Sequence, residues 1–427
     1  MEIPEKKARR RLIALLTLGY AGYYLCRSNF SVTLPLLIDY LEGTGLSADE
    51  ASIALGGVAS AGVLAYAGGK FLSGPFNDRF GGRVGFLGGM AGSVLFTVLF
   101  ALAGGLPLFS IAWIGNRLVQ SGGWVGMVQI CSRWLPAASY ASAMAIVSQS
   151  FLFGDALIRV GLGYLLAFGA GWRLVFVISA ALLLFLCLWI ARELHGAPEE
   201  RNLPEPPPHP ENIFAAAPAA IGPGEILRGL MASPSFRIVC ILSFGLTLLR
   251  ETFNIWTPLY FVQAAGMEVG AAARWSAIFP FFGGLSVLAA GVLGDRVGRW
   301  GRSVVIILAC IGSAGALYGL SSVSDRPDPG TAILLVALVA MTTLAAYAYL
   351  AGATAIDLGG KVGSGTASGL IDGFGYLGGI LAGRGIADLA TGGGWGHAFA
   401  ALSLVALGCA VSGLFLSYYE RGARETA

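Results

Sequence analysis

Charged residues are scarce in this sequence of 427 residues. Aspartate, glutamate, lysine and arginine together make up only 12% of it, whereas hydrophobic residues make up 56%. A soluble protein carries roughly 25% charged residues. So few charges leave too little polar surface to cover a water-soluble globule of this size. We therefore expect a protein whose main solvent is a lipid bilayer.

Several catalytic and metal-binding patterns are also missing. The six cysteines form no CxxC pair and have no metal-ligand spacing, so they are interpreted as small buried hydrophobes. No G-x-x-x-x-G-K-[ST] loop is present, which argues against ATP hydrolysis. The three histidines form no triad, and a net charge of only +3 argues against nucleic acid. We expect neither an enzyme nor a cofactor or metal.

Long apolar segments recur along the whole chain between short polar or glycine-rich breaks. A bilayer-spanning helix needs about 20 such residues. The pattern predicts an all-α membrane protein with twelve transmembrane helices, at 12–38, 48–76, 84–104, 107–131, 140–168, 172–194, 235–263, 271–297, 302–322, 330–355, 362–390 and 394–418.

Lysine and arginine are distributed unevenly among the segments between these spans. The tails and alternate loops carry eighteen of them: Lys6, Lys7, Arg9, Arg10, Arg11, Arg79, Arg83, Arg133, Arg192, Arg201, Arg228, Arg237, Arg296, Arg299, Arg302, Lys361, Arg421 and Arg424. The opposite loops carry only Arg173, Arg274 and Arg326. By the positive-inside rule both termini are cytoplasmic. The basic leader "MEIPEKKARRR" precedes an apolar segment too long for a signal peptide, so we expect a cytoplasmic tail.

The sequence predicts two pseudo-symmetric halves of six helices each, residues 1–194 and 235–427. They are separated by a proline-rich cytoplasmic linker over 195–234. "GPFNDRFGGR" in the first half corresponds to "GVLGDRVGR" in the second. Arg27 and Arg250 lie the same number of residues apart as Trp172 and Trp395, so each arginine occupies the middle of the first helix of its half.

An arginine in the middle of a membrane span costs about 2.5–3.5 kcal/mol on insertion scales, so a functional role is expected. A guanidinium offers paired donors that match phosphate oxygens. Arg27 and Arg250 are therefore predicted to bind a phosphoryl group, one from each half. The alternative is that each arginine forms a structural ion pair with a buried carboxylate.

The chain resembles the major facilitator superfamily in its G-x-x-x-D-R-x-G-x-R loops and twelve spans. Within it, "YYLCRSNFSVTLPLL", "LLRETFNIWTPLYF", "GGKFLSGPFNDR", "QSGGW" and "GTASGLIDGFGYLGG" resemble the organophosphate:phosphate antiporters of glycerol 3-phosphate and hexose phosphates. The resemblance implies that Arg27 and Arg250 are the phosphate-binding pair and that Lys70 lies near the site. It implies no cofactor and a small anionic substrate, and we expect a monomer in the inner (plasma) membrane.

Further residues are predicted from these matched segments. Candidate substrate contacts are Tyr23, Tyr24, Asn29, Trp124, Asn254, Trp256, Tyr260, Asp372 and Tyr376. The candidate gating residues, which cap helix ends or pair across the loops, are Asp78, Arg79, Arg83, Asp295, Arg296 and Arg299. Tyr24 is the favoured aromatic because it lies three residues before Arg27 on one helix face.

The chain departs from the antiporter pattern where a fifth-span histidine would lie, since Leu152 and Phe153 stand there. Additional charges stand within the predicted spans at Asp155, Arg159, Glu251 and Arg384, as well as Asp372, and we expect them to be buried. The leading prediction is exchange of an organic phosphate ester for inorganic phosphate by alternating access. Two alternatives stay open: a proton-coupled symporter of another organic anion, and a membrane sensor that binds a sugar phosphate.

Overall fold

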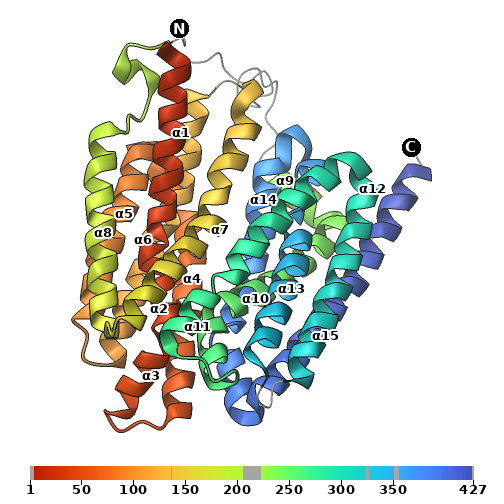
Figure 1. Ribbon diagram of the computed structural model, residues 1–427. Coiled ribbons are helices and arrows are strands. Elements are labelled where there is room, and N and C mark those ends of the chain that lie inside the picture. Colours follow the sequence, from red (N-terminus) through yellow and green to blue (C-terminus); the bar gives the residue numbers. More distant parts are fainter. Residues whose placement is uncertain (1–3, 136, 205–222, 324–326, 351–354, 426–427) are drawn as a thin grey trace. The chain divides into compact units, whose positions relative to one another are not determined.

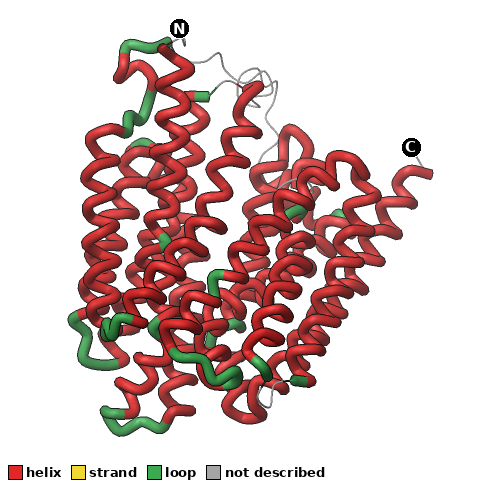
Figure 2. Tube along the Cα trace, viewed as in Figure 1, coloured by secondary structure: helices red, strands yellow, loops and turns green. Residues whose placement is uncertain are grey.

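The computed structural model describes residues 4–135, 137–204, 223–323, 327–350 and 355–425. These residues form α-helices and one short 3₁₀ helix, with no β-strand among them (Figures 1 and 2). The contacts divide the chain into two compact units. The predicted boundaries of the halves, at 194 and 235, stay a prediction.

The first unit contains the N-terminal helices and one short helix from later in the chain. Its elements are α1 (Pro4–Tyr23), α2 (Leu25–Val32), α3 (Leu34–Glu42), α4 (Ala48–Phe80), α5 (Gly82–Ala101), α6 (Leu106–Trp134), α7 (Ala137–Ala167), α8 (Trp172–Glu193), the 3₁₀ helix η1 (Pro198–Arg201) and α11 (Val269–Trp275). Helix α6 packs against both α4 and α5, and α7 packs against α1 and α11.

The second unit contains the remaining helices. They are α9 (Pro223–Ala232), α10 (Pro234–Gln263), α12 (Ile278–Ser322), α13 (Pro329–Tyr347), α14 (Ala355–Leu381) and α15 (Arg384–Glu425). Helix α10 packs against α14 and α15, while α12 packs against α13 and α15. Helix α15 bends at Gly394, whose φ of +78° lies in the left-handed region that glycine adopts without strain.

Nine helical stretches in the described part of the chain are long and apolar enough to cross a membrane. They account for ten of the twelve predicted spans, because the stretch Gly369–Tyr419 covers two of them. The other two predicted spans, 12–38 and 107–131, are also helical, as α1–α3 and α6. The first of these spans is divided among three helices, of which α2 and α3 have only 8 and 9 residues, and α6 carries Arg117 inside its apolar run.

Breaks in the first predicted span separate α1, α2 and α3. Helix α3 begins directly after Thr33, and Pro35 stands in its first turn, where the missing N–H of proline costs no intrahelical hydrogen bond. Helix α2 is therefore a short segment between two interruptions, and it carries Arg27. One difference from the sequence prediction is α9, a helix within the segment expected to be an extended linker.

Two glycines of α4 allow α6 to approach closely. A side-chain carbon at Gly62 would lie 2.5 Å from Nε1 of Trp113 and 3.0 Å from Cγ of Arg117. At Gly69 it would lie 2.3 Å from Oγ of Ser121. Small residues at such positions permit close helix packing in membranes. This approach brings the middle of α6 against the middle of α4.

Candidate functional site

Three cationic side chains surround one tyrosine ring in the first unit. The guanidinium carbon of Arg117 lies 4.6 Å from the centroid of the Tyr66 ring, that of Arg27 lies 5.1 Å away, and Nζ of Lys70 also lies 5.1 Å away. Tyr66 and Lys70 stand four residues apart on α4, so both fall on one helix face. Arg27 comes from α2 and Arg117 from α6.

A polar network on α6 holds this cluster together. Nε2 of Gln120 donates to the carbonyl oxygen of Cys26 at 3.2 Å and to Oδ1 of Asn116 at 2.6 Å. Nη1 of Arg117 donates to Oε1 of Gln120 at 3.5 Å. Because Cys26 directly precedes Arg27, this network fixes the backbone of α2 against α6.

The cluster concentrates positive charge inside a membrane-spanning unit. Tyr66 and Arg117 are buried, with 2% and 3% of their surfaces exposed, whereas Arg27 and Lys70 are half-buried. Tyr24 also faces Arg27, with its ring centroid 5.2 Å from the guanidinium carbon, as the three-residue spacing predicted. The negative faces of these rings partly offset the three charges. Several cations gathered on neighbouring helices suit an anionic ligand.

Arg250 lies in a different electrostatic setting on α10. Its Nη2 is 2.8 Å from Oε1 of Glu251, and both side chains are largely buried. The guanidinium carbon lies 4.6 Å from the Tyr347 ring centroid and 5.8 Å from that of Tyr376. The hydroxyl of Tyr347 donates to Oδ1 of Asp372 at 3.5 Å.

This ion pair occupies only part of the Arg250 guanidinium. Nε is buried and has no hydrogen-bond partner among the described residues. The two arginines that the sequence placed in equivalent positions therefore differ. Arg27 belongs to a group of cations, and Arg250 belongs to a group that includes the carboxylates of Glu251 and Asp372.

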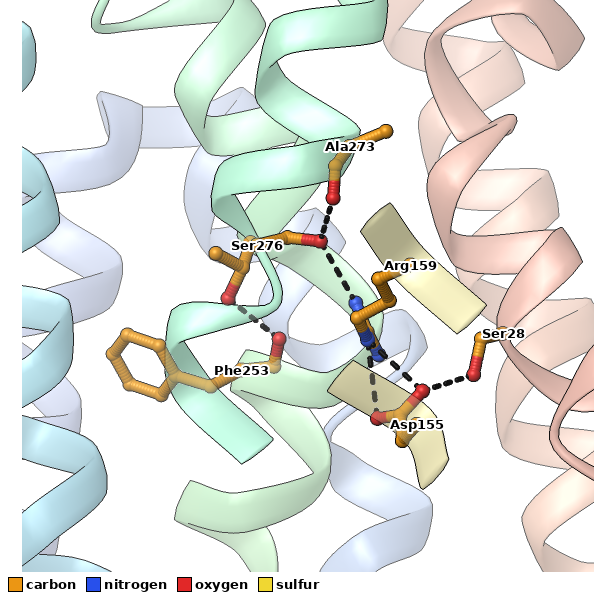
Figure 3. A network of polar contacts seen from close by, with 7 residues as sticks. Ser28, Asp155, Arg159, Phe253, Ala273 and Ser276 are labelled. Carbon is orange, nitrogen blue, oxygen red and sulfur yellow. Dashed lines mark hydrogen bonds and ion pairs between the residues drawn. The ribbon is translucent and has the colours of Figure 1, made fainter. Parts of the chain in front are cut away.

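A second buried ion pair connects three segments of the first unit (Figure 3). Nε of Arg159 lies 3.1 Å from both carboxylate oxygens of Asp155, and Nη1 donates to Oγ of Ser276 at 3.2 Å. Oγ of Ser28 on α2 donates to Oδ1 of Asp155. Each of these four residues is at least 97% buried. The network joins α2 and α7 to Ser276, the residue that follows α11.

Four predicted aromatic contacts take part in packing. The hydroxyl of Tyr23 donates to the carbonyl oxygen of Phe86, and Nε1 of Trp256 donates to that of Ala382 at 2.7 Å. Tyr260 is 1% exposed and packs against Trp395 and Phe399, and its hydroxyl has no hydrogen-bond partner among the described residues. Trp124 stacks edge-on against Tyr20. The structure does not bring these rings to Arg27 or Arg250.

The two predicted asparagines differ in burial. Asn29 is 0% exposed, and its Oδ1 accepts a hydrogen bond from the backbone N–H of Phe30. Its Nδ2 is buried and has no hydrogen-bond partner in the described part of the chain. Asn254 is half-buried on α10, one turn after Arg250.

Most of the predicted gating side chains lie outside the described residues: Asp78, Arg79, Asp295, Arg296 and Arg299. Arg83 is described, and its Nη2 donates to the carbonyl oxygen of Ala191 at 2.7 Å. This bond ties the start of α5 to the end of α8. The preceding turn contains Gly81 with a φ of +86°.

Sequence reasoning missed four residues of these clusters as site candidates: Tyr66, Arg117, Glu251 and Tyr347. Tyr66 could have been found from its spacing, since it stands one turn before Lys70. Arg117 shows the same signal as Arg27, an arginine within an apolar run. Glu251 was noted only as an added charge. Tyr347 gives no signal, because its contact with Arg250 depends on tertiary packing.

Comparison with known proteins places these observations in a family. The sequence profile of the Major Facilitator Superfamily matches residues 16–383. A probable hexose phosphate transport protein of Chlamydia muridarum is 26% identical over 93% of this chain and 89% of its own length. The glycerol-3-phosphate transporter of Bacillus subtilis is 25% identical over 89% of this chain and 85% of its own.

Two further similarities concern a sensor and a solved structure. The membrane sensor protein UhpC of Escherichia coli is 24% identical over 93% of this chain and 90% of its own length. The crystal structure of a D-xylose–proton symporter superposes with a TM-score of 0.74 at 15% identity, covering 95% of this chain and 96% of the symporter. At that identity the superposition shows the fold alone.

The family match covers most of the chain and confirms the predicted fold class: an all-helical, multi-pass membrane protein with the twelve-helix, two-half architecture. The family comprises transporters rather than enzymes, as the missing catalytic patterns indicated. The chain belongs to the major facilitator superfamily and, as its arginine motifs predicted, resembles the organophosphate:phosphate antiporters within it.

Proposed function

We propose that the protein is a secondary active transporter that moves an organic phosphate ester across the membrane in exchange for inorganic phosphate. Alternating access of a substrate site near the bilayer midplane requires no covalent chemistry. The observation that carries this proposal is the cation cluster around Tyr66. Arg27 and Lys70 each hold a charge within 5.1 Å of the same ring centroid, on different helices.

The chemistry of the cluster suits a phosphate group. The Arg27 guanidinium can donate two parallel hydrogen bonds to phosphate oxygens, and the Lys70 ammonium adds a compact charge. The Tyr24 and Tyr66 rings restrict where Arg27 can lie, which reduces the entropy lost when a ligand binds. Arg27 is supplied by α2, Tyr24 directly precedes that helix, and Tyr66 and Lys70 are supplied by α4.

Arg250 is proposed as the phosphate-binding residue of the second unit. Glu251 holds one of its nitrogens at 2.8 Å, and Nε is left to donate to a ligand. Glu251, Asp372, Tyr347 and Tyr376 supply acceptors and hydroxyls suited to the polar part of a phosphate ester. We propose Tyr376 and Asp372 as substrate contacts, whereas we assign no substrate contact to Tyr23, Trp124, Trp256 or Tyr260.

The orientation in the membrane is part of the proposal. The excess of lysine and arginine in alternate loops supports cytoplasmic N- and C-termini in the inner membrane. We propose a monomer as the working unit. The loop residues Asp78, Arg79, Arg83, Asp295, Arg296 and Arg299 are proposed to lie at the cytoplasmic ends of the helices and to latch them.

Transport by purified protein in sealed vesicles tests the exchange. Vesicles loaded with inorganic phosphate should take up labelled glucose 6-phosphate or glycerol 3-phosphate from the outside, and phosphate-free vesicles should not. Uptake that needs a pH gradient and no internal phosphate would instead establish proton symport. The buried carboxylate of Glu251 and the half-buried carboxylate of Asp372 favour that as the second candidate.

A sensor is the remaining candidate, favoured by the similarity to UhpC along most of the chain. A sensor would bind a phosphate ester without moving it. Binding of glucose 6-phosphate by calorimetry, combined with no flux under any gradient, would select this function over transport.

A further inference from the structure

Two hydroxyl groups of α10 are buried without a hydrogen-bond partner. Ser243 and Thr247 are 1% and 2% exposed, and neither hydroxyl oxygen has a partner among the described residues. A serine or threonine inside a helix often bonds to the carbonyl oxygen four residues before it. Thr252, on the same helix and also 2% exposed, donates in this way to Leu248 at 2.8 Å. Ser243 and Thr247 therefore differ from another equally buried hydroxyl of their own helix.

Both hydroxyls lie in line with Arg250. Ser243, Thr247 and Arg250 are separated by four and then three residues, so they fall on one face of α10. At 1.5 Å per residue they extend over about 10 Å of the helix. Nε of Arg250 is likewise buried with no hydrogen-bond partner in the described part of the chain. Buried polar atoms are nearly always hydrogen-bonded, so three such atoms in a row call for a functional explanation.

Helix α14 covers this face of α10 with glycines. A side-chain carbon added at Gly375 would lie 2.6 Å from both hydroxyl oxygens, and one added at Gly378 would lie 2.1 Å from the carbonyl oxygen of Phe244. Tyr376, the residue after Gly375, has its ring centroid 5.8 Å from the guanidinium carbon of Arg250. Glycines present no side chain that interlocks with α10. Helix α14 can therefore move along α10 or away from it without breaking side-chain packing at these positions.

We propose that Ser243 and Thr247 bind the phosphate group next to Arg250 once α14 has moved away from them. Since one point lies 2.6 Å from both oxygens, they are no further apart than twice that distance, and one oxyanion can accept from both. Hydrogen bonds to an oxyanion are stronger than those between neutral groups, so phosphate is a good acceptor for these hydroxyls.

This inference rests on the proposed function and extends its phosphate site. The additional contacts run from Arg250 towards the N-terminal end of α10. The proposed orientation places that end at the cytoplasmic side of the membrane.

Removing one hydroxyl at nearly constant shape tests the proposed contact. Thr247→Val replaces the hydroxyl by a methyl group, and the matched control Thr252→Val does the same on the other side of α10. Calorimetry of inorganic phosphate on the purified full-length proteins should show about tenfold weaker binding in Thr247→Val, the loss of one charge-assisted hydrogen bond. Ser243→Ala should weaken binding to a similar extent. Thr252→Val should bind phosphate as the wild type does.

Thermal unfolding without ligand provides a second measurement, because the two valine variants should change in different directions. Thr252→Val loses the hydrogen bond to Leu248 and should unfold at a lower temperature. Thr247→Val removes a buried hydroxyl that no described residue pairs with, so it should unfold at the same or a higher temperature. Weaker phosphate binding without a loss of stability is not expected of a hydroxyl that serves only the packing of α10.

The outcomes separate this inference from the proposed function. Wild-type phosphate affinity in folded Thr247→Val and Ser243→Ala proteins would overturn the inference and leave phosphate binding by Arg250 standing. A Thr247→Val protein that unfolds at a clearly lower temperature or fails to fold would also overturn it, because the hydroxyl would then be structural. If the wild-type protein binds neither inorganic phosphate nor glycerol 3-phosphate, the proposed function and the inference fall together.

Discussion

Asp155→Asn should destabilise the protein strongly, because it leaves the charge of Arg159 buried without its partner. The two side chains are 3% and 5% exposed and their atoms lie 3.1 Å apart. At that separation and an effective dielectric constant of about 20, the Coulomb attraction is about 5 kcal/mol. Removing one partner of a buried pair typically costs about 3–5 kcal/mol. We expect a loss in that range.

The chain provides a matched control with the same spacing. Arg384 and Asp388 also stand four residues apart, but their atoms lie 3.6 Å apart and their side chains are 67% and 50% exposed. Asp388→Asn should therefore change the free energy of unfolding by less than about 1 kcal/mol. Denaturant titration of the purified variants, monitored by tryptophan fluorescence, measures the free energy of unfolding of Asp155→Asn and of Asp388→Asn.

The double variant Asp155→Asn/Arg159→Gln completes the cycle. It removes both charges, so it should be more stable than Asp155→Asn alone, with a coupling energy of about 2–3 kcal/mol. If Asp155→Asn proved as mild as Asp388→Asn, the reasoning that this pair stabilises the contact of α7 with Ser276 would be refuted.

Three further predictions concern the gate, the orientation and the coupling. Asp78→Asn should slow transport and leave substrate binding within a few-fold, and loss of binding in a folded variant would place Asp78 at the site instead. A cysteine introduced at Pro207 should resist an impermeant reagent added outside intact cells, whereas efficient labelling would reverse the proposed topology. Asp372→Asn should retain phosphate–phosphate exchange but change the preference among esters, because Asp372 accepts a hydrogen bond from Tyr347, which packs on Arg250. Complete loss of exchange in this variant would favour proton coupling.

Much of the fold could be predicted because a bilayer restricts the chain to helices of limited length. Hydrophobic runs alone located the spans. The interruptions of the helix at Tyr24 and Thr33 were harder to predict. Pro35 follows Thr33, but a proline in a membrane span can lie within a helix or in the first turn of a new one. The ten-residue helix α9 escaped prediction because the surrounding prolines suggested an extended chain.

The candidate site was predicted only in part. Arg27, Lys70 and Tyr24 were found from their position in a span and from helical spacing, and the structure brings all three together with Tyr66. Arg117 was not predicted, although its burial is just as costly, because no arginine stands at the equivalent position of the other half. The Arg250–Glu251 pair depends on the side-chain conformations of adjacent residues, which periodicity does not specify.

Phosphate binding by the two arginines is the central claim, and calorimetry of inorganic phosphate tests it most directly. Arg27→Lys and Arg250→Lys keep each charge but remove the paired donors, so each should weaken phosphate binding about ten- to a hundred-fold. Arg192→Lys, at the end of α8, is the control and should bind as the wild type does. Wild-type phosphate affinity in both folded lysine variants would contradict the account and return Arg27 and Arg250 to purely structural roles.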